Sequence, residues 1–577
     1  MMRELIRDAS FGQLLRYLMN NRVLHYPEEE PGFQWLAAHS EGRSHSSKKP
    51  TNRDDIEKQE LPGNDTNSST AEAAMEEVVD DSLQNIEKTS STTPSDPPEE
   101  DEALRPISVA SRPIAPIRTA DGVILVDWYA TDDPDNPQNW SSKKKIWTAF
   151  VINIYTFVVY ASSSIYVSSH GLIMERFGVG DFKASLGLAL YVLGYGMGPL
   201  IFAPLSEVAT FGRNTPYITT FALFIILALP TSLVDNLGGL LALRFLLRFF
   251  GSPCLASGGA SMGDMYSFLT LPYAIGWWVS AAFAAPALGP LLSGFAVLWM
   301  AGPVFLIFFF FVPETSPSTI LLHRAALLRK ASGNEKIRSQ TEIKSHGISL
   351  KNVVVEAILK PLEITFKDPA MLFVNVYIAL TYGIYYSFFE VFPLVYPVMY
   401  GFNVGVTGVV FVCIIVGCII SMAIYFSYLY FFLNPDVRAN GLRAQEYRLR
   451  PALLACFGPT IGLFLFAWLA NPSIHWMGTV VGCTIYAITV YIIMQCVFTY
   501  IPLPYPQYAA SLFAGNDLFR SLFASGSVLF SRSMYINLGV DKGLSLLGGL
   551  SVIGIIGMWL LCFYGAKLRA RSKFAVS

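Results

Sequence analysis

Charged side chains are scarce in this chain of 577 residues. Asp, Glu, Lys and Arg make up 15% of it, whereas an average soluble domain has roughly 25%. The formal net charge is −2, so there is no basic excess that would favour nucleic acid as a partner. Hydrophobic residues make up 53%, and a soluble protein of this length would need a far more polar surface. These proportions indicate a chain that lies mostly in lipid.

The chain also lacks the short motifs of common enzymes and pumps. It contains no P-loop, no His-Glu-x-x-His pair and no Gly-x-Ser-x-Gly elbow, and its seven histidines are scattered. Its seven cysteines form no Cys-x-x-Cys pair and lie in or beside apolar stretches, as packing residues do. We therefore expect no enzyme activity, no metal, no cofactor and no ATP-driven pump. The first residues carry no apolar segment of a cleavable signal peptide, so insertion is expected to begin at the first span.

Long apolar runs are what the sequence has in abundance. A bilayer core of roughly 30 Å needs about 20 apolar residues per helix, and lipid offers an unpaired backbone no partners. The runs predict an all-α integral membrane protein with twelve transmembrane helices in two six-helix halves, a layout of secondary transporters built from repeats. The expected spans are residues 146–166, 183–205, 215–234, 239–262, 271–294, 297–312, 371–393, 405–430, 451–470, 474–500, 505–530 and 543–564.

These spans divide the chain into five regions. Basic residues gather before the first span, between the sixth and seventh, after the eighth and behind the last, which predicts that both termini are cytoplasmic. The regions are a cytoplasmic N-terminal region 1–140, largely disordered over 38–105; an N-terminal transmembrane half 141–312 with spans one to six; a central cytoplasmic loop 313–370; a C-terminal transmembrane half 371–564 with spans seven to twelve; and a cytoplasmic tail 565–577.

The N-terminal region begins with a segment that can fold. Residues 1–37 predict one short amphipathic helix that ends near Tyr26 and Pro27, because apolar residues such as Ile6 and Phe11 recur near helical spacing. The helix could rest on the membrane surface, but packing against the helical core is favoured. The stretch that follows is rich in Ser, Thr, Asp, Glu and Pro and cannot bury enough apolar surface to fold.

The loop after the second span has the features of a gate. Glycines on the preceding helix allow close approach to a neighbouring helix. Glu207 and Arg213 flank a tight turn that Gly212 helps to form, and charges placed there can interact with helix ends and with a neighbouring helix. We favour a latch that holds one gate state over an ordinary solvated pair of loop charges.

Several segments resemble one family. The loop PLSEVATFGR at 204–213 is similar to the signature loop of the major facilitator superfamily, in the form found in fungal drug:proton antiporters. The likeness covers nearly the whole chain and is strongest to the twelve-span multidrug exporters of the fluconazole-resistance type. The other matching segments are DDPDNPQNW at 132–140, LALRFLLRFFGSP around Arg244, PALGPLLSG at 286–294, PET at 313–315 and YPQYAASLFAGNDLFRS at 505–521.

The resemblance implies export of small organic compounds or drugs in exchange for protons by alternating access. It gives Arg244 a role in proton coupling, and a cation inside an apolar helix must find an acid, a carbonyl or water. A structural ion pair is the alternative for Arg244, and a passive kink is the alternative to a leak-limiting role for the span-five motif. The gating residues implied are Gly198, Pro204, Glu207, Gly212, Arg213, Gly289, Pro290 and Gly294.

Polar residues among aromatics in the C-terminal half are candidates for the proton and substrate sites. Glu390 could carry protons from such surroundings, and pairing at the outer mouth is an equal alternative. Asp517 lies three residues from Arg520, so the two share a helix face and either form a polar patch or simply pair. The proton-coupling candidates are Arg244, Glu390 and Asp517, and the cavity candidates are Tyr382, Tyr385, Tyr386, Phe389, Gln495 and Asn516.

Two places depart from the family pattern. Spans five and six run together at Val297 and Leu298, where the family carries a loop. We expect a misread exon boundary there, and otherwise strained helices or one long helix that would invert the second half. Arg248 stands where the family has a small glycine, one turn after Arg244, so two cations share a face within the membrane.

These departures keep more than one function open. The alternatives to an exporter are a transport-impaired or sensor-like relative on the same scaffold, and a transporter that couples protons to polyamines or other small metabolites. The expected partners are small-molecule substrates, protons and the lipid bilayer, with no nucleic acid, and the protein is expected to be monomeric. The plasma membrane is the expected location, with the vacuolar membrane as the alternative.

Overall fold

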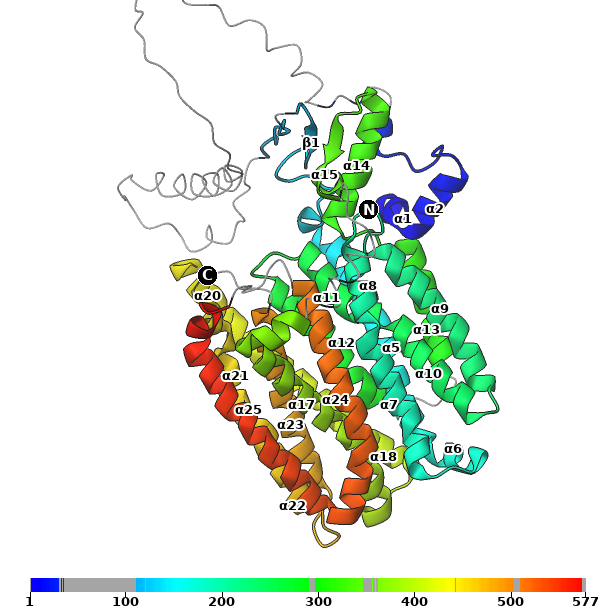
Figure 1. The fold of residues 1–577 in the computed structure, drawn as a ribbon, viewed down its shortest axis with the longest axis vertical. Coiled ribbons are helices and arrows are strands. Elements are labelled where there is room, and N and C mark those ends of the chain that lie inside the picture. The colour runs from blue at the N-terminus through cyan, green and yellow to red at the C-terminus, as the bar shows by residue number, and fades with distance from the viewer. Residues whose placement is uncertain are drawn as a thin grey trace, which may run out of the picture. The chain divides into compact units, whose positions relative to one another are not determined.

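The computed structural model shows a bundle of long helices (Figure 1). It describes residues 2–30, 33, 35, 111–119, 121–289, 296–345, 355, 359, 362–441, 443–501 and 509–572. The segment 38–105, which the sequence predicts to be disordered, lies outside the described residues. In the described part, helices form nearly all the regular structure, as the apolar runs predict.

The first half of the bundle is built from residues 142–311. Proline at the start of α8 and of α11 removes a backbone donor, which divides each of two spans into a joined pair of helices. The helices are α5 (Ser142–Ser168), α7 (Asp181–Met197) with α8 (Pro199–Glu207), α9 (Asn214–Leu233), α10 (Leu237–Gly251) with α11 (Pro253–Met265), α12 (Leu271–Leu288) and α13 (Ala296–Phe311), and the short α6 (His170–Phe177) joins α5 to α7.

The second half is built from residues 369–569. Its helices are α17 (Pro369–Pro393) with η5 (Leu394–Met399), α18 (Val404–Val410) with α19 (Val412–Tyr428), η6 (Leu429–Leu433) and α20 (Asn434–Asn440), η7 (Gln445–Leu449) with α21 (Arg450–Ala455) and α22 (Phe457–Leu469), α23 (Met477–Tyr500), α24 (Ala509–Leu538) and α25 (Val540–Arg569). Each of the twelve predicted spans corresponds to one helix or joined set in the two halves.

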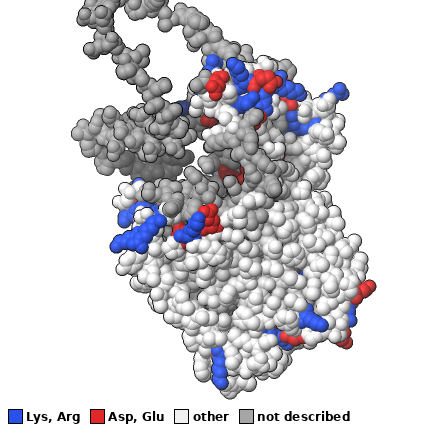
Figure 2. All heavy atoms as spheres, in the orientation of Figure 1, with Lys and Arg blue, Asp and Glu red and all other residues white. Residues whose placement is uncertain are grey.

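The helices have the length and the surface expected in lipid. Among the described residues, ten helices or joined sets are long and apolar enough to cross a membrane. The helix α13 is apolar but shorter, and α24 has 30 residues that include the charged Asp517, Arg520 and Arg532. On the face seen in Figure 2, charged atoms gather toward the ends of the bundle and leave a broad uncharged zone between them. Large apolar side chains such as Phe431 and Phe563 are exposed on the bundle, as lipid contact requires.

Each half packs mainly on itself, and several helix pairs join the halves. In the first half, α5 lies against α12 and α7 against α10; in the second, α17 lies against α24 and α22 against α23. Across the halves, α7 contacts α24 along much of its length and α12 contacts α19. A two-body arrangement with a long shared interface results.

The helices α12 and α13 run in opposite directions. The start of α12 follows α11, whose Asp264 pairs with Arg213, and the end of α13 leads to Glu314, which also binds Arg213. Both of those ends therefore lie at one end of the bundle, which we call the latch face. Residues 290–295 lie outside the described part, and the opposite directions of α12 and α13 show that spans five and six are not one long helix.

The N-terminal segment packs on the protein at the latch face. It forms two short helices, α1 (Met2–Asp8) and α2 (Ser10–Leu18), and the prediction of one helix was wrong. The helices are separated because the extended backbone of Ala9 forms a β-bridge with Pro313, next to the end of α13. The ring of Phe11 then lies 4.6 Å from that of Phe310, so the segment contacts the helical core.

A second contact joins the segment before α5 to the segment after α13. Strand β1 (Ile124–Val126) pairs in parallel with β2 (Ile337–Ser339), which follows α14 (Pro317–Ser332) and precedes α15 (Gln340–Ser345). Since paired strands lie on one side of a membrane, an even number of crossings must separate them.

Arg324 on α14 strengthens this contact with carboxylates from two other segments. Its guanidinium lies 2.7 Å from Asp133, 2.7 Å from Asp135 and 3.4 Å from Glu28. We call Arg324 with these three carboxylates the clasp. It ties the N-terminal segment, the residues before α5 and the connecting loop together outside the bundle.

Candidate functional site

The predicted latch is an ion-pair network around Arg213. The Arg213 guanidinium donates to Asp264 at 3.1 Å and to the Ser206 hydroxyl at 3.0 Å. Its backbone N–H and that of Asn214 donate to the two carboxylate oxygens of Glu314, each at 3.0 Å. Asn214 is the first residue of α9, so the Glu314 carboxylate sits at the positive end of that helix. The network joins the ends of α8, α9, α11 and α13.

Glu207 forms no ion pair with Arg213 among the described residues, although the two charges interact. Its side chain is exposed, and among the described residues Arg213 forms its ion pair with Asp264 instead. The turn itself needs a glycine, because Gly212 has φ +65° and a Cβ there would lie 2.5 Å from the Glu314 carboxylate. Pro204 is buried inside α8.

Two predicted gating glycines are sites of close helix approach within the first half. A Cβ at Gly198 would meet the Ser252 hydroxyl at 2.0 Å, and one at Gly289 would meet the Ser164 hydroxyl at 1.9 Å. Gly198 therefore brings α8 onto the α10–α11 junction, and Gly289 brings the end of α12 onto α5. Pro290 and Gly294 lie outside the described residues.

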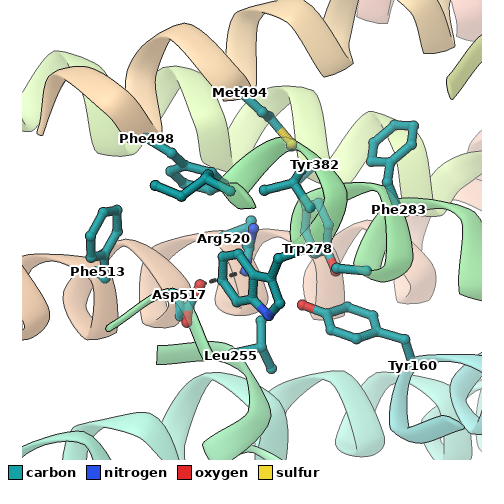
Figure 3. Close-up of a pocket in the computed structure, with 14 residues that line it drawn as sticks. Tyr160, Leu255, Trp278, Phe283, Tyr382, Met494, Phe498, Phe513, Asp517 and Arg520 are labelled. Atoms are coloured by element: carbon teal, nitrogen blue, oxygen red, sulfur yellow. Dashed lines mark hydrogen bonds and ion pairs between the residues drawn. The ribbon is translucent and has the colours of Figure 1, made fainter. Parts of the chain in front are cut away.

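A cavity lies between the two halves near the middle of the bundle (Figure 3). The first half contributes Tyr160, Trp278 and Phe283, and the second half contributes Tyr382 and Phe498 among other residues. Its walls are mostly apolar and aromatic, and its ionised groups are Asp517 and Arg520 on α24. A concave aromatic site with a few polar groups is the usual form of a small-molecule site.

Asp517 and Arg520 form a buried ion pair in the cavity wall. The guanidinium lies 2.5 Å from the Asp517 carboxylate, over the ring of Tyr382 and in contact with the Tyr195 hydroxyl. The Tyr195 hydroxyl is also hydrogen-bonded to that of Tyr160. Because Tyr160 and Tyr195 belong to the first half and the ion pair to the second, these polar groups connect the two bodies.

Arg248 lies behind this network and is almost completely buried, at 2% exposure. Its guanidinium lies 4.3 Å from the ring centre of Tyr160 and 4.6 Å from that of Tyr195. The nearby Arg244 faces elsewhere. It lies 4.4 Å from the ring centre of Tyr166 and donates to backbone carbonyls of α5 and α7, including those of Gly187 and Ser163.

The predicted cavity residues are distributed over different environments. Tyr382 lines the central cavity, and the Tyr385 hydroxyl donates to the Phe283 carbonyl across the halves at 3.0 Å. Tyr386 is buried, with its ring 5.1 Å from that of Tyr382. Gln495 is buried on α23, and Asn516 donates to Asn375 on α17 at 2.9 Å, within the second half; neither lines the central cavity.

Glu390 lies in a separate pocket at the other end of the bundle, which we call the far face. Phe389 and Arg532 line the same pocket. Arg532 on α24 pairs with Asp181 at the start of α7, at 2.8 Å, and His170 lies 2.9 Å from the same carboxylate. These residues form an ion-pair group that joins the halves at the far face.

Sequence reasoning missed several members of the two charged networks. Asp264 was not among the candidates, and Glu314 was considered only as part of the family motif PET at 313–315. His170, Asp181 and Arg532 carried no local signal, since each is a single charge near the end of an apolar run. Arg213 and Asp264 are 51 residues apart, and Asp181 and Arg532 are 351 residues apart. Whether such distant residues meet depends on how the helices pack, and a single sequence does not give that packing.

Comparison with known proteins agrees with the fold and with these motifs. The sequence model of the Major Facilitator Superfamily matches residues 152–522 of this chain. The crystal structure of the human organic anion transporter MFSD10 (TETRAN) has a similar fold, with a TM-score of 0.52 over 74% of this chain and 99% of that one, at 15% identity.

Fungal relatives are similar over most of the sequence. The MFS-type transporter pyvG of Aspergillus violaceofuscus is 42% identical over 79% of this chain and 86% of its own. Fluconazole resistance protein 1 of Saccharomyces cerevisiae is 37% identical over 78% and 84%, and the cycloheximide resistance protein of Candida maltosa is 36% identical over 78% and 86%.

The fold and the central cavity are those of a membrane transporter, not of a soluble protein. The chain belongs to the Major Facilitator Superfamily, and relatives at 36% to 42% identity are fungal transporters and resistance proteins.

Proposed function

We propose that this protein exports small organic compounds, including drugs, in exchange for protons by alternating access. The observation that carries the proposal is the aromatic cavity between the two halves, with the Asp517–Arg520 ion pair in its wall. Aromatic walls bind flat apolar bodies, and a buried carboxyl that exchanges partners can take up and release a proton. The names of the relatives support drugs as substrates.

Contacts between the halves at the two faces supply the gates in this proposal. At the far face, Arg532 of the second half pairs with Asp181 of the first. Toward the latch face, the Asn434 side chain of the second half donates to the Tyr273 hydroxyl of the first at 3.0 Å. Rocking of the halves would break one set of contacts while the other holds, so the cavity would open to one side at a time.

The proposal also assigns roles and a location. Arg244, Glu390 and Asp517 take part in proton coupling, and the glycines and prolines named above set the helix contacts that change during gating. The latch face and both termini are cytoplasmic, in agreement with the positive charges there. The protein works as a monomer in the plasma membrane.

The test is an efflux assay in yeast cells that lack their own drug exporters. Cells that express the chain should tolerate more fluconazole or cycloheximide and should accumulate less of a labelled drug. An uncoupler that collapses the proton gradient should abolish this difference. Unchanged accumulation, with the protein correctly located in the plasma membrane, would remove the exporter hypothesis.

A further inference from the structure

The central cavity and the side chains behind its wall together hold more positive than negative charge, because Asp517 and Arg520 line the cavity and Arg248 lies behind Tyr160. Arg248 and Arg520 are buried at 2% and 5% exposure, and Asp517, at 6%, is the carboxylate between their helices. Arg520 forms its ion pair with Asp517. Arg248 forms no ion pair with any residue that the structure describes, and the undescribed membrane segments 290–295 and 502–508 contain no acidic residue.

Neither guanidinium has all its donors satisfied. Nη1 of Arg248 and Nε of Arg520 are buried without an acceptor among the described residues. The rings of Tyr160, Tyr195 and Tyr382 lie 4.3 to 4.6 Å from these guanidinium carbons and give some cation–π attraction. That attraction is smaller than the cost of removing a guanidinium from water. An arginine cannot reduce the cost by losing its proton, so the cluster requires an acceptor from elsewhere.

We propose that the central cavity binds organic anions, with aromatic carboxylates as the preferred class. The inference rests on the export function above and narrows its substrates. The carboxylate of the substrate lies near Arg520 in the cavity wall, and its negative charge also offsets that of Arg248 behind the wall. Its ring lies among Trp278, Phe498 and Tyr382, which line the cavity with Arg520 (Figure 3).

The charge of such a substrate also suits exchange for protons. Moving an anion out of a cell and a proton into it transfers positive charge inward in both steps. A membrane potential that is negative inside therefore favours both movements. A cationic substrate would instead be repelled by the excess positive charge of Arg248 behind the cavity wall.

The test compares three probes of the same shape with the purified full-length protein. They are 2-naphthoate, the uncharged 2-naphthamide and the cationic 2-naphthylmethylammonium, and binding is measured by calorimetry. We expect 2-naphthoate to bind at least tenfold more tightly than the other two. R248Q should weaken 2-naphthoate at least tenfold and leave 2-naphthamide nearly unchanged, whereas D517N should strengthen 2-naphthoate. R176Q is the matched control, because Arg176 is an exposed arginine paired with Asp235.

Several results would overturn the inference. The inference fails if the natural chain binds 2-naphthamide or the cation as tightly as 2-naphthoate, or more tightly. This measurement requires no variant. Unchanged 2-naphthoate binding by a folded R248Q protein, with folding checked by 2-naphthamide binding, would also overturn it. Efflux assays separate this failure from that of the proposed function. Export of 2-naphthamide without preference for 2-naphthoate rejects the anion class alone, and export of no probe or drug rejects the exporter.

Discussion

Glu314 accepts the backbone N–H groups of Arg213 and Asn214 on its two carboxylate oxygens, each at 3.0 Å. One of these oxygens also accepts the N–H groups of Thr315 and Ser316 at 2.9 Å. The Glu314 side chain, which follows α13, therefore fixes the backbone at the start of α9. It also fixes the backbone of Thr315 and Ser316, the two residues that follow it. Arg213 is held at both its main chain and its guanidinium, which leaves it little freedom while the latch is closed.

Replacing Glu314 by Gln should loosen the latch. The amide keeps one accepting oxygen and turns a donor toward a backbone N–H, so about 1.5–3 kcal/mol of charge-assisted hydrogen bonding is lost. We expect a lower thermal unfolding temperature in detergent and reduced efflux. E335Q is the control, since Glu335 is exposed in the same connecting region. Equal unfolding temperatures for the two variants would show that Glu314 does not hold the latch.

Replacing Gly196 by Ala should disturb the contact between the halves. A Cβ at this position would lie 2.5 Å from the Ser521 Cβ on α24, so α7 and α24 could no longer approach as closely. We expect efflux to fall several-fold with normal protein levels. G526A on α24 is the control, because nothing lies within 4 Å of a Cβ there. Adding S521G should restore part of the activity of G196A, and no restoration would count against this contact.

Replacing Arg324 by Gln should open the clasp. The change removes the one cation that Asp133, Asp135 and Glu28 share, leaving Arg7 near Asp135, and breaking a buried pair costs about 3–5 kcal/mol. Limited proteolysis should then cut near β1 and α2 at rates at least tenfold higher. K330Q, an exposed position on the same helix, should leave these rates unchanged. Equal protection in the two variants would argue against the clasp.

Acid should open the same clasp. Burial acts to raise the pKa of the Asp133 carboxyl, but the hydrogen bond and charge of Arg324 outweigh it and hold that pKa below its ordinary value. A carboxyl with a lowered pKa stabilises the folded form above its unfolded pKa, about 3.9, and this contribution is lost as pH falls through the folded pKa. Hydrogen exchange at β1 should therefore stay slow at neutral pH and rise below about pH 4. R324Q should lose this acid-induced step.

The carboxyls that carry protons can be found with amide variants. D517N and E390Q fix these side chains in a neutral form, so a proton-carrying site should lose pH-driven efflux at least tenfold while substrate counterflow continues. Asp517 lies in the central cavity and Glu390 in the far-face pocket, so the two variants test different positions along the path. If efflux by a variant still depends on external pH, the replaced carboxyl is not the group that couples efflux to protons.

The sequence predicted the bundle well because apolar length is a local property. Each predicted span has its helix, and the turn formed by Gly212 is where the loop motif indicated. Partner choice was not predicted. The motif indicated that Glu207 and Arg213 interact with helix ends and a neighbouring helix, but it did not name Asp264 as the partner of Arg213. The extended backbone at Ala9 was also missed, because its partner Pro313 lies 304 residues further along.

The residues of the central site were also predicted only in part, because local spacing is visible in the sequence and helix packing is not. The spacing of Asp517 and Arg520 by one helical turn predicted a shared helix face, with their pairing as one of two alternatives, and the structure shows the pair. The carbonyl partners of Arg244 were among the alternatives that burial allowed. The contacts of Arg248 with Tyr160 and Tyr195 were not foreseen, since they involve three helices whose rotation is set by packing.

The pairing of β1 with β2 makes the first half of the molecule a closed unit. Residues 124–126 and 337–339 fasten the chain on both sides of six spans, and no described residue of the second half belongs to these two strands. During synthesis it can therefore close as soon as residue 339 has left the ribosome, before the seventh helix has been made.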